Sequence, residues 1–164
     1  MVSTNFLRQV SIFRGLNHEE LEVVSEIMGE WECSKGQFIF KEGDESEVLY
    51  ILKKGEMGIH ISTGLLVNHT LGKVSEGEVF GELGFIDREP RAASIKCTQH
   101  ALLFSITRDD FKRIGKANPN IQRIIYKNIA RVIARRLRHA NNQLRELAGK
   151  DKTLAVFLPQ QFMV

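Results

Sequence analysis

The 164-residue sequence lacks the features that mark membrane proteins, secreted disulfide-rich proteins and metalloproteins. No apolar run approaches the roughly 18 residues of a membrane helix, and the N-terminus lacks the apolar core of a signal peptide. The two cysteines, Cys33 and Cys97, are not spaced as metal ligands are, and two cysteines are too few for a disulfide framework. We therefore expect buried free thiols, no metal and a cytoplasmic location.

Catalytic side-chain groupings are also missing from the sequence. The five histidines are scattered, and no nucleophile stands beside a candidate base. The share of hydrophobic residues, 43%, is ordinary for a globular chain, and the length suits one domain with a buried core. We therefore expect a binding domain and not an enzyme.

Charge is divided unevenly along the chain. Residues 1–107 hold 10 Lys and Arg against 16 Asp and Glu, whereas residues 108–150 hold 12 against 3. A basic surplus of this kind fits a nucleic-acid surface, or a solvated helix face opposite an apolar one. We favour the solvated face and expect no DNA contact.

Helical signals lie at both ends of the domain. Apolar residues at helical spacing predict a short helix over residues 5–13. Asn17 followed by Glu20 is a capping box that opens a second helix. A similar signature at Thr107 opens a helix over about residues 108–117.

Between these helices the sequence changes to short apolar runs separated by glycine-containing turns. Many short strands with regular turn signals predict an antiparallel sandwich or barrel, spanning about residues 30–107. The runs cover residues 37–41, 48–52, 57–61, 65–71 and 101–106.

A long helix follows, because Asn118 caps it and Pro119 suits its first position. Apolar residues recur at helical spacing from Ile121 to Leu147. A small β domain cannot bury so long a stripe, so we expect a homodimer through residues 119–148.

The most informative stretch is residues 80–97, which read F-G-E-L-G-F-I-D-R-E-P-R-A-A-S-I-K-C. Gly81 and Gly84 permit backbone conformations and close approaches that a side chain would prevent. Glu82 can accept hydrogen bonds from a hydroxyl group, and Arg91 offers a fork of donors to a phosphate. The combination suits a sugar phosphate. The alternative is an exposed Glu82–Arg91 salt bridge of little energetic value.

The G-E-L triplet followed by P-R-A-A-S resembles the phosphate-binding cassette of the cyclic nucleotide-binding domain family. Its members include the catabolite activator protein, regulatory subunits of the cyclic-AMP-dependent protein kinase, and gated channels. The resemblance covers roughly residues 6–148. It implies a mainly β, α+β fold, in which an antiparallel, jelly-roll-like β-roll is flanked by N-terminal helices and a long C-terminal helix.

This resemblance also implies the roles of individual residues. Glu82 would bind the ribose 2′-hydroxyl, and Arg91 would neutralise the cyclic phosphate. A hydroxyl residue directly after the arginine accompanies cyclic GMP in the family; here that residue is Ala92, so cyclic AMP is favoured over cyclic GMP. Other expected cassette and pocket residues are Gly81, Leu83, Gly84, Ala93, Leu71 and Phe80.

The end of the long helix aligns with the region that contacts adenine in the activator protein. Asn141, with Asn142 beside it, could pair with an adenine edge; alternatively both are solvated or set the register of a dimer seam. Residues 149–164 form a short apolar tail, too small for a helix-turn-helix. The tail could cover the pocket, pack on a dimer partner or dock an effector protein.

Together these features predict a stand-alone cytoplasmic sensor over residues 1–148. Cyclic AMP would bind in the cassette and reposition the helix from Pro119 onward, without catalysis and without a membrane contact. One rival hypothesis is a dimeric adaptor on the same fold, with a vestigial or cyclic-GMP-binding pocket. Another is a nucleic-acid-associated regulator that uses the basic helix.

Overall fold

The structure, a computed structural model, describes residues 2–62 and 68–150. The chain divides into two compact units, Met1–Asn128 and Ile129–Val164. Beyond Lys150 the predicted apolar tail lies outside the described residues. Among the described helices, none is long and apolar enough to cross a membrane.

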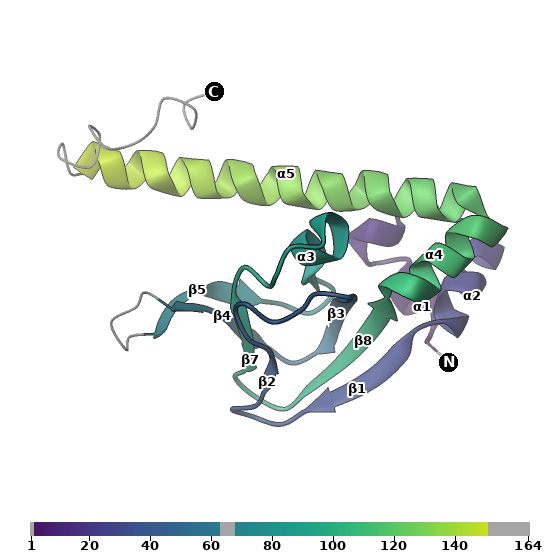
Figure 1. Cartoon of the computed structure of the whole chain (residues 1–164), viewed down its shortest axis with the longest axis horizontal. Helices are drawn as coiled ribbons and strands as arrows, with labels where there is room; N and C mark the ends of the chain where they lie inside the picture. Colours follow the sequence, from purple (N-terminus) through teal and green to yellow (C-terminus); the bar gives the residue numbers. More distant parts are fainter. Residues whose placement is uncertain (1, 63–67, 151–164) are drawn as a thin grey trace. The chain divides into compact units, whose positions relative to one another are not determined.

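The first unit is built on two four-stranded antiparallel sheets, which confirms the predicted β-roll (Figure 1). One sheet has the order β1-β8-β3-β6 and the other β2-β7-β4-β5. The strands are β1 Gly29–Cys33, β2 Phe38–Phe40, β3 Val48–Lys54, β4 Met57–Ser62, β5 Asn68–Val74, β6 Val79–Phe80, β7 Ser94–Cys97 and β8 Ala101–Thr107.

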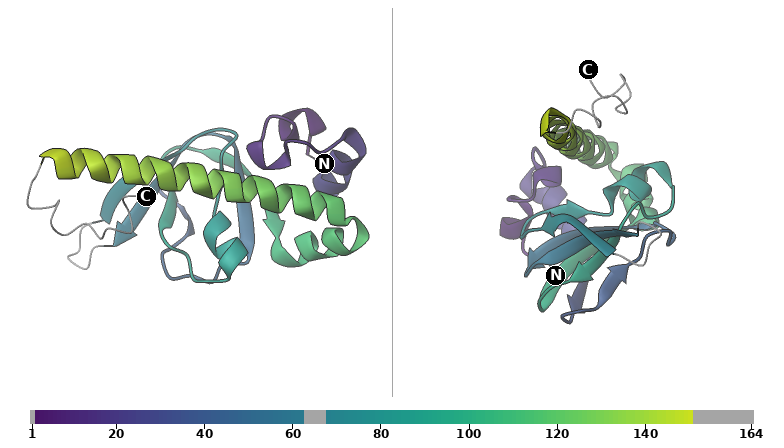
Figure 2. Two further views of the ribbon diagram at one scale, coloured as in Figure 1. Left: turned by 90° about the horizontal axis from the view of Figure 1, so that it is seen from above. Right: turned by 90° about the vertical axis from the view of Figure 1, so that its left-hand side faces the viewer.

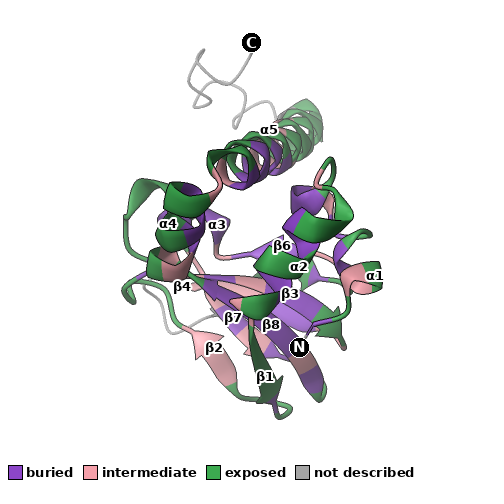
Figure 3. Cartoon of the chain, turned by 90° about the vertical axis from the view of Figure 1, so that its right-hand side faces the viewer, coloured by how far each residue is buried: buried purple, intermediate pink, exposed green. Residues whose placement is uncertain are grey.

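The predicted apolar runs correspond to β2, β3, β4, β5 and β8. The run at residues 65–71 begins outside the described residues, and its strand continues to Val74. Strand β1 was not predicted, because Gly29–Glu32 are exposed and carry no apolar alternation (Figure 3). The buried core between the sheets includes Leu52, Met57, Val74, Phe80, Ile95 and Leu103.

Cys33 and Cys97 form a disulfide, so the expectation of free thiols is wrong. Their Cα atoms lie 6.5 Å apart although 64 positions separate them in sequence. The turn after β1 joins the end of β7, since the Gly36 N–H donates to the Cys97 carbonyl over 2.8 Å. Sequence spacing cannot reveal this contact between strands of different sheets. The disulfide also removes the free-thiol argument for a reducing compartment.

The N-terminal segment is not the single helix predicted over residues 5–13. It forms α1, Thr4–Leu7, and a short 3₁₀ helix η1, Ser11–Phe13. Between them Val10 has an extended backbone, with φ −78° and ψ 125°. The break allows Val10 and Ile12 to be fully buried together, although one helical face could not hold both.

The other helices begin where their capping residues predict. In α2, His18–Glu26, the Glu20 N–H donates to Asn17 Oδ1 and the Asn17 N–H donates to Glu20 Oε2, each over 2.9 Å. In α4, Arg108–Ala117, the Asp110 N–H donates to the Thr107 hydroxyl. Figures 1 and 2 show α1, α2 and α4 together at one end of the roll. The short α3, Glu82–Asp87, lies within the cassette.

The long helix α5, Pro119–Lys150, is tied to the N-terminal segment in its first part. The buried amide of Asn128 donates to the carbonyls of Ile12 and Arg14 over 3.0 and 2.8 Å. Asn120 Nδ2 donates to Glu20 Oε1 over 2.6 Å. These bonds fix residues 119–128 of the helix within the first unit.

Replacing Asn128 with Ala should lower the free energy of unfolding by about 1–3 kcal/mol, because the buried Ile12 carbonyl and the partly buried Arg14 carbonyl lose their donor. Urea titration of both proteins measures the difference. Asn142→Ala, an exposed position of the same helix, should change stability by less than about 0.5 kcal/mol. Equal effects of the two substitutions would contradict the assigned role of Asn128.

Candidate functional site

The cassette, residues 80–97, begins with a turn that only glycine suits. Gly81 follows β6 and caps α3 with a left-handed backbone, φ 74°. A Cβ atom there would lie 2.5 Å from Arg91 Nη1. At Gly84 a Cβ atom would lie 2.6 Å from the Glu89 carbonyl oxygen. The two glycines therefore allow α3 to pack closely against the loop that carries Arg91.

Arg91 is buried, with only 5% of its surface exposed. Its Nη1 donates to the Gly81 carbonyl over 2.9 Å, and its Nη2 donates to the Val48 carbonyl over 2.7 Å. Its Nε is also buried and has no hydrogen-bond partner. Among the described residues no carboxylate forms an ion pair with this guanidinium. The cassette therefore holds a desolvated cation with a spare donor.

Glu82 opens α3 and is 4% exposed. Its negative charge acts on Arg91 and raises the pKa of that guanidinium. The alternative of an exposed Glu82–Arg91 pair is thus excluded, since both side chains are buried. The fold instead brings a carboxylate and a guanidinium to the same short loop.

Several electrostatic effects act on Arg91. Burial lowers the pKa of Arg91, and the positive charge of Arg108 lowers it further, whereas Tyr50, Asp44 and Glu82 act in the opposite direction. Burial also raises the pKa of Tyr50, and the charge of Arg91 partly offsets this rise. The site therefore favours a bound anion, which would compensate the desolvated charge of Arg91.

The other predicted site residues differ in exposure. Leu71 is 60% exposed and Leu83 is 43% exposed, so both present apolar surface. Phe80 belongs to the core and stacks on Tyr50 at 5.3 Å between ring centroids. Ala92 is exposed and Ala93 half-buried, so their small side chains leave the loop accessible. Asn141 and Asn142 belong to the second unit, and their contact with the base stays a prediction.

Sequence reasoning missed the aromatic side chains beside the cassette arginine. The Phe40 ring centroid lies 4.1 Å from Arg91 Cζ, and that of Tyr50 lies 5.9 Å away. Phe40, Tyr50 and Phe80 also contact one another. No motif marks Phe40 or Tyr50, because they come from different strands and read as ordinary core positions, whereas Phe80 was expected in the pocket.

Arg108, at the start of α4, was also missed. Its Nη2 donates to the carbonyls of Gly84, over 2.7 Å, and of Ser46, and its Nε donates to the Phe85 carbonyl over 3.3 Å. The Ser46 hydroxyl in turn donates to the Glu89 carbonyl over 2.6 Å. Arg108 therefore joins the loop before β3, α3 and α4.

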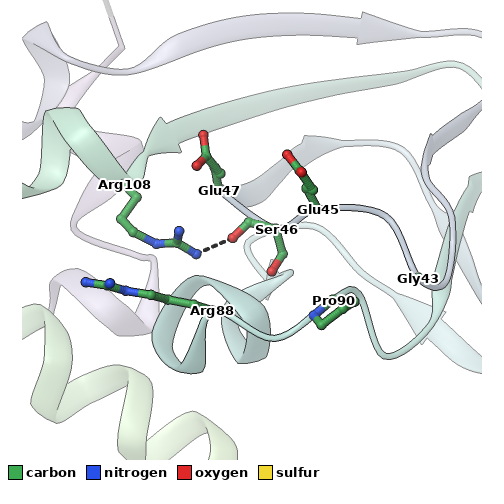
Figure 4. Close-up of a pocket in the computed structure, with 7 residues that line it drawn as sticks. All are labelled: Gly43, Glu45, Ser46, Glu47, Arg88, Pro90 and Arg108. Carbon is green, nitrogen blue, oxygen red and sulfur yellow. Dashed lines mark hydrogen bonds between the residues drawn. The ribbon is translucent and has the colours of Figure 1, made fainter.

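A cavity of about 270 Å³ lies beside Arg108 on the outer side of the cassette (Figure 4). Two arginines and two glutamates face it, so its lining has no excess of positive charge. Its lining residues are Gly43, Glu45, Ser46, Glu47, Arg88, Pro90 and Arg108.

The fold is a β-roll domain whose cassette loop holds a buried arginine. A family model described as the cyclic nucleotide-binding domain matches residues 30–118, more than half of the chain. The protein therefore belongs to the cyclic nucleotide-binding domain family.

Similar proteins include a protein kinase and a regulatory subunit of a protein kinase. The cGMP-dependent protein kinase of Eimeria tenella is 32% identical over 76% of this chain and 12% of its own length. The cAMP-dependent protein kinase regulatory subunit of Emericella nidulans is 30% identical over 72% of this chain and 28% of its own length. The chain thus spans only a small part of these relatives.

Solved structures agree with the fold. The catabolite activator protein of Thermus thermophilus has a TM-score of 0.73 and 28% identity, covering 84% of this chain and 63% of that one. A cyclic nucleotide-binding domain from Methylobacillus flagellatus has a TM-score of 0.77 at 19% identity, covering 85% of this chain and 79% of that one. The second likeness concerns the fold alone.

The raised pKa of Tyr50 predicts a loss of stability at high pH. An acid whose folded pKa is raised stabilises the fold below its unfolded pKa of about 10, and this contribution disappears as the pH rises through the folded pKa. Tyr50→Phe should therefore lose less stability than the wild type between about pH 9 and 11. Thermal unfolding across this range measures the effect.

Tyr126→Phe provides the control, because Tyr126 is exposed and lies on α5. Its pH dependence should match the wild type. An unchanged pH dependence in Tyr50→Phe would show that the Tyr50 hydroxyl is not desolvated as described.

Proposed function

We propose that the protein is a cyclic AMP sensor in which the cassette binds the cyclic phosphate at Arg91. The observation that carries this proposal is the buried Arg91 guanidinium, whose Nε has no hydrogen-bond partner and which has no carboxylate ion pair within the described part of the chain. A buried charge without a counterion costs free energy, and a phosphate would supply both charge and acceptor oxygens. The site would thus be completed by its ligand.

The remaining cassette residues would orient the nucleotide. Glu82 would accept a hydrogen bond from the ribose 2′-hydroxyl, because an ionised carboxylate is an acceptor only. The backbone N–H groups of Leu83 and Ala93 would donate to the phosphate. Ala92 offers no hydroxyl, which favours cyclic AMP, whereas the similar proteins include kinases named for either nucleotide.

Signal output would pass through α5 without catalysis. The contacts of Asn120 and Asn128 hold residues 119–128 in the first unit, so the responding segment would begin after Asn128 and not at Pro119. The ligand can shift this helix only by its differential affinity for two helix states. An effector protein downstream stays a prediction, as does the cytoplasmic location.

Homodimerisation is supported by apolar side chains on the second part of α5. Leu137 and Leu147 are 55% and 53% exposed. Exposed leucines along one helix are the pattern that a parallel helix pair would bury. A twofold pair of α5 helices would give the sensor two coupled sites.

Replacing Arg91 with Ala should weaken cyclic AMP binding by about 100-fold or more, because charge-assisted hydrogen bonds to phosphate are lost. Calorimetric titration of protein refolded from denaturant, which is free of co-purified nucleotide, measures the change. Arg88→Ala, three positions away on the exposed side of the loop, should bind as the wild type does. Full affinity in Arg91→Ala would refute the cassette assignment.

The double substitution Leu137→Glu with Leu147→Glu should convert the dimer to a monomer, since two charges would be buried in the helix pair. Sedimentation velocity measures the mass. Val23→Glu changes an equally apolar exposed position on α2 and should leave the dimer intact. A wild-type protein that is monomeric at high concentration would contradict the dimer proposal.

A further inference from the structure

The three closest neighbours of the Arg91 guanidinium are two backbone carbonyls and one aromatic ring. Two backbone carbonyls, of Gly81 and Val48, accept from its terminal nitrogens. The third neighbour is the aromatic ring of Phe40, whose centroid lies 4.1 Å from the guanidinium carbon. This distance is well within the range of a cation–π contact, and such contacts are strongest for desolvated cations.

An aromatic ring suits a phosphate-binding arginine better than a carboxylate would. The negative ring face stabilises a positive charge but does not accept hydrogen bonds in the guanidinium plane. A carboxylate would occupy the donors and compete with an incoming anion. With Phe40 as the neighbour, the Nε donor of Arg91 stays without a partner.

A β-bulge directs Phe40 toward this position. Phe38 pairs with Lys96 of β7, but Phe40 pairs with Ile95, so the register shifts between them. Since adjacent residues of β7 face opposite sides, the shift places Phe38 and Phe40 on opposite faces of the sheet. Phe38 contacts Lys41 and Lys96, whereas Phe40 contacts Arg91 and the rings of Tyr50 and Phe80.

We propose that Phe40 is a positioning residue of the phosphate site: its ring holds the Arg91 guanidinium in the orientation that binds a cyclic nucleotide phosphate. This inference rests on the function proposed above. It adds that the affinity of the site depends on ring chemistry at residue 40, and not only on an apolar side chain of suitable size.

The test compares Phe40→Leu, Phe40→Tyr and Phe38→Leu by calorimetric titration with cyclic AMP. Phe40→Leu keeps an apolar side chain but removes the ring, and should weaken binding by about 3- to 30-fold. Phe40→Tyr keeps the ring face and should bind within about twofold of the wild type. Phe38→Leu, the same substitution in the same strand, should also bind as the wild type does.

A second measurement covers the case in which Phe40→Leu fails to fold. Stacking on Phe40 should move the side-chain protons of Arg91 upfield in the wild-type NMR spectrum, and Arg91→Lys assigns their resonances. The shift should persist in Phe40→Tyr. Its absence in the wild type would overturn the inference.

Two binding outcomes would also overturn it. One is an unchanged affinity in Phe40→Leu, and the other is an equal loss in Phe40→Leu and Phe40→Tyr, which would indicate a packing role only. A wild-type protein that binds neither cyclic AMP nor cyclic GMP would instead defeat the proposed function, and with it the role of Phe40 in binding.

Discussion

The desolvated charge of Arg91 is the constraint on which the rest of the site depends. Because an arginine stays protonated even when it is buried, neighbouring groups must stabilise its charge. Two carbonyls and the aromatic rings of Phe40 and Tyr50 do so here, and none of them neutralises it. Gly81 is required because any side chain would displace the guanidinium. The cassette is thus arranged around a cation whose buried Nε has no hydrogen-bond partner among the described residues.

The elements around the cassette form a connected scaffold. Arg108 binds carbonyls of α3 and of the loop before β3 from the first position of α4. The N-terminal segment in turn holds the beginning of α5 through Asn128 and Glu20. These contacts are hydrogen bonds between buried or half-buried groups, whose loss leaves partners unsatisfied. These hydrogen bonds resist a conformational change at the cassette. Any movement of α5 would therefore begin beyond residue 128.

Local signals in the sequence were sufficient to predict several helix starts, most strands and the cassette. The Asn17 capping box, the strand runs and the paired glycines of the cassette each reflect chemistry within a few residues. The disulfide, the break at Val10 and the bulge that turns Phe40 inward depend on contacts between distant segments. Periodicity cannot show which of several apolar residues will be buried together. The aromatic neighbours of Arg91 were missed for the same reason, since they come from separate strands.

A crystal structure of the complex with cyclic AMP tests the central claim most directly. The account predicts a phosphate oxygen within about 3 Å of the Arg91 guanidinium, with Nε as one of its donors. It also predicts that the Phe40 ring still covers the guanidinium face. A nucleotide bound elsewhere, with Arg91 bonded only to the carbonyls of Gly81 and Val48, would contradict the account.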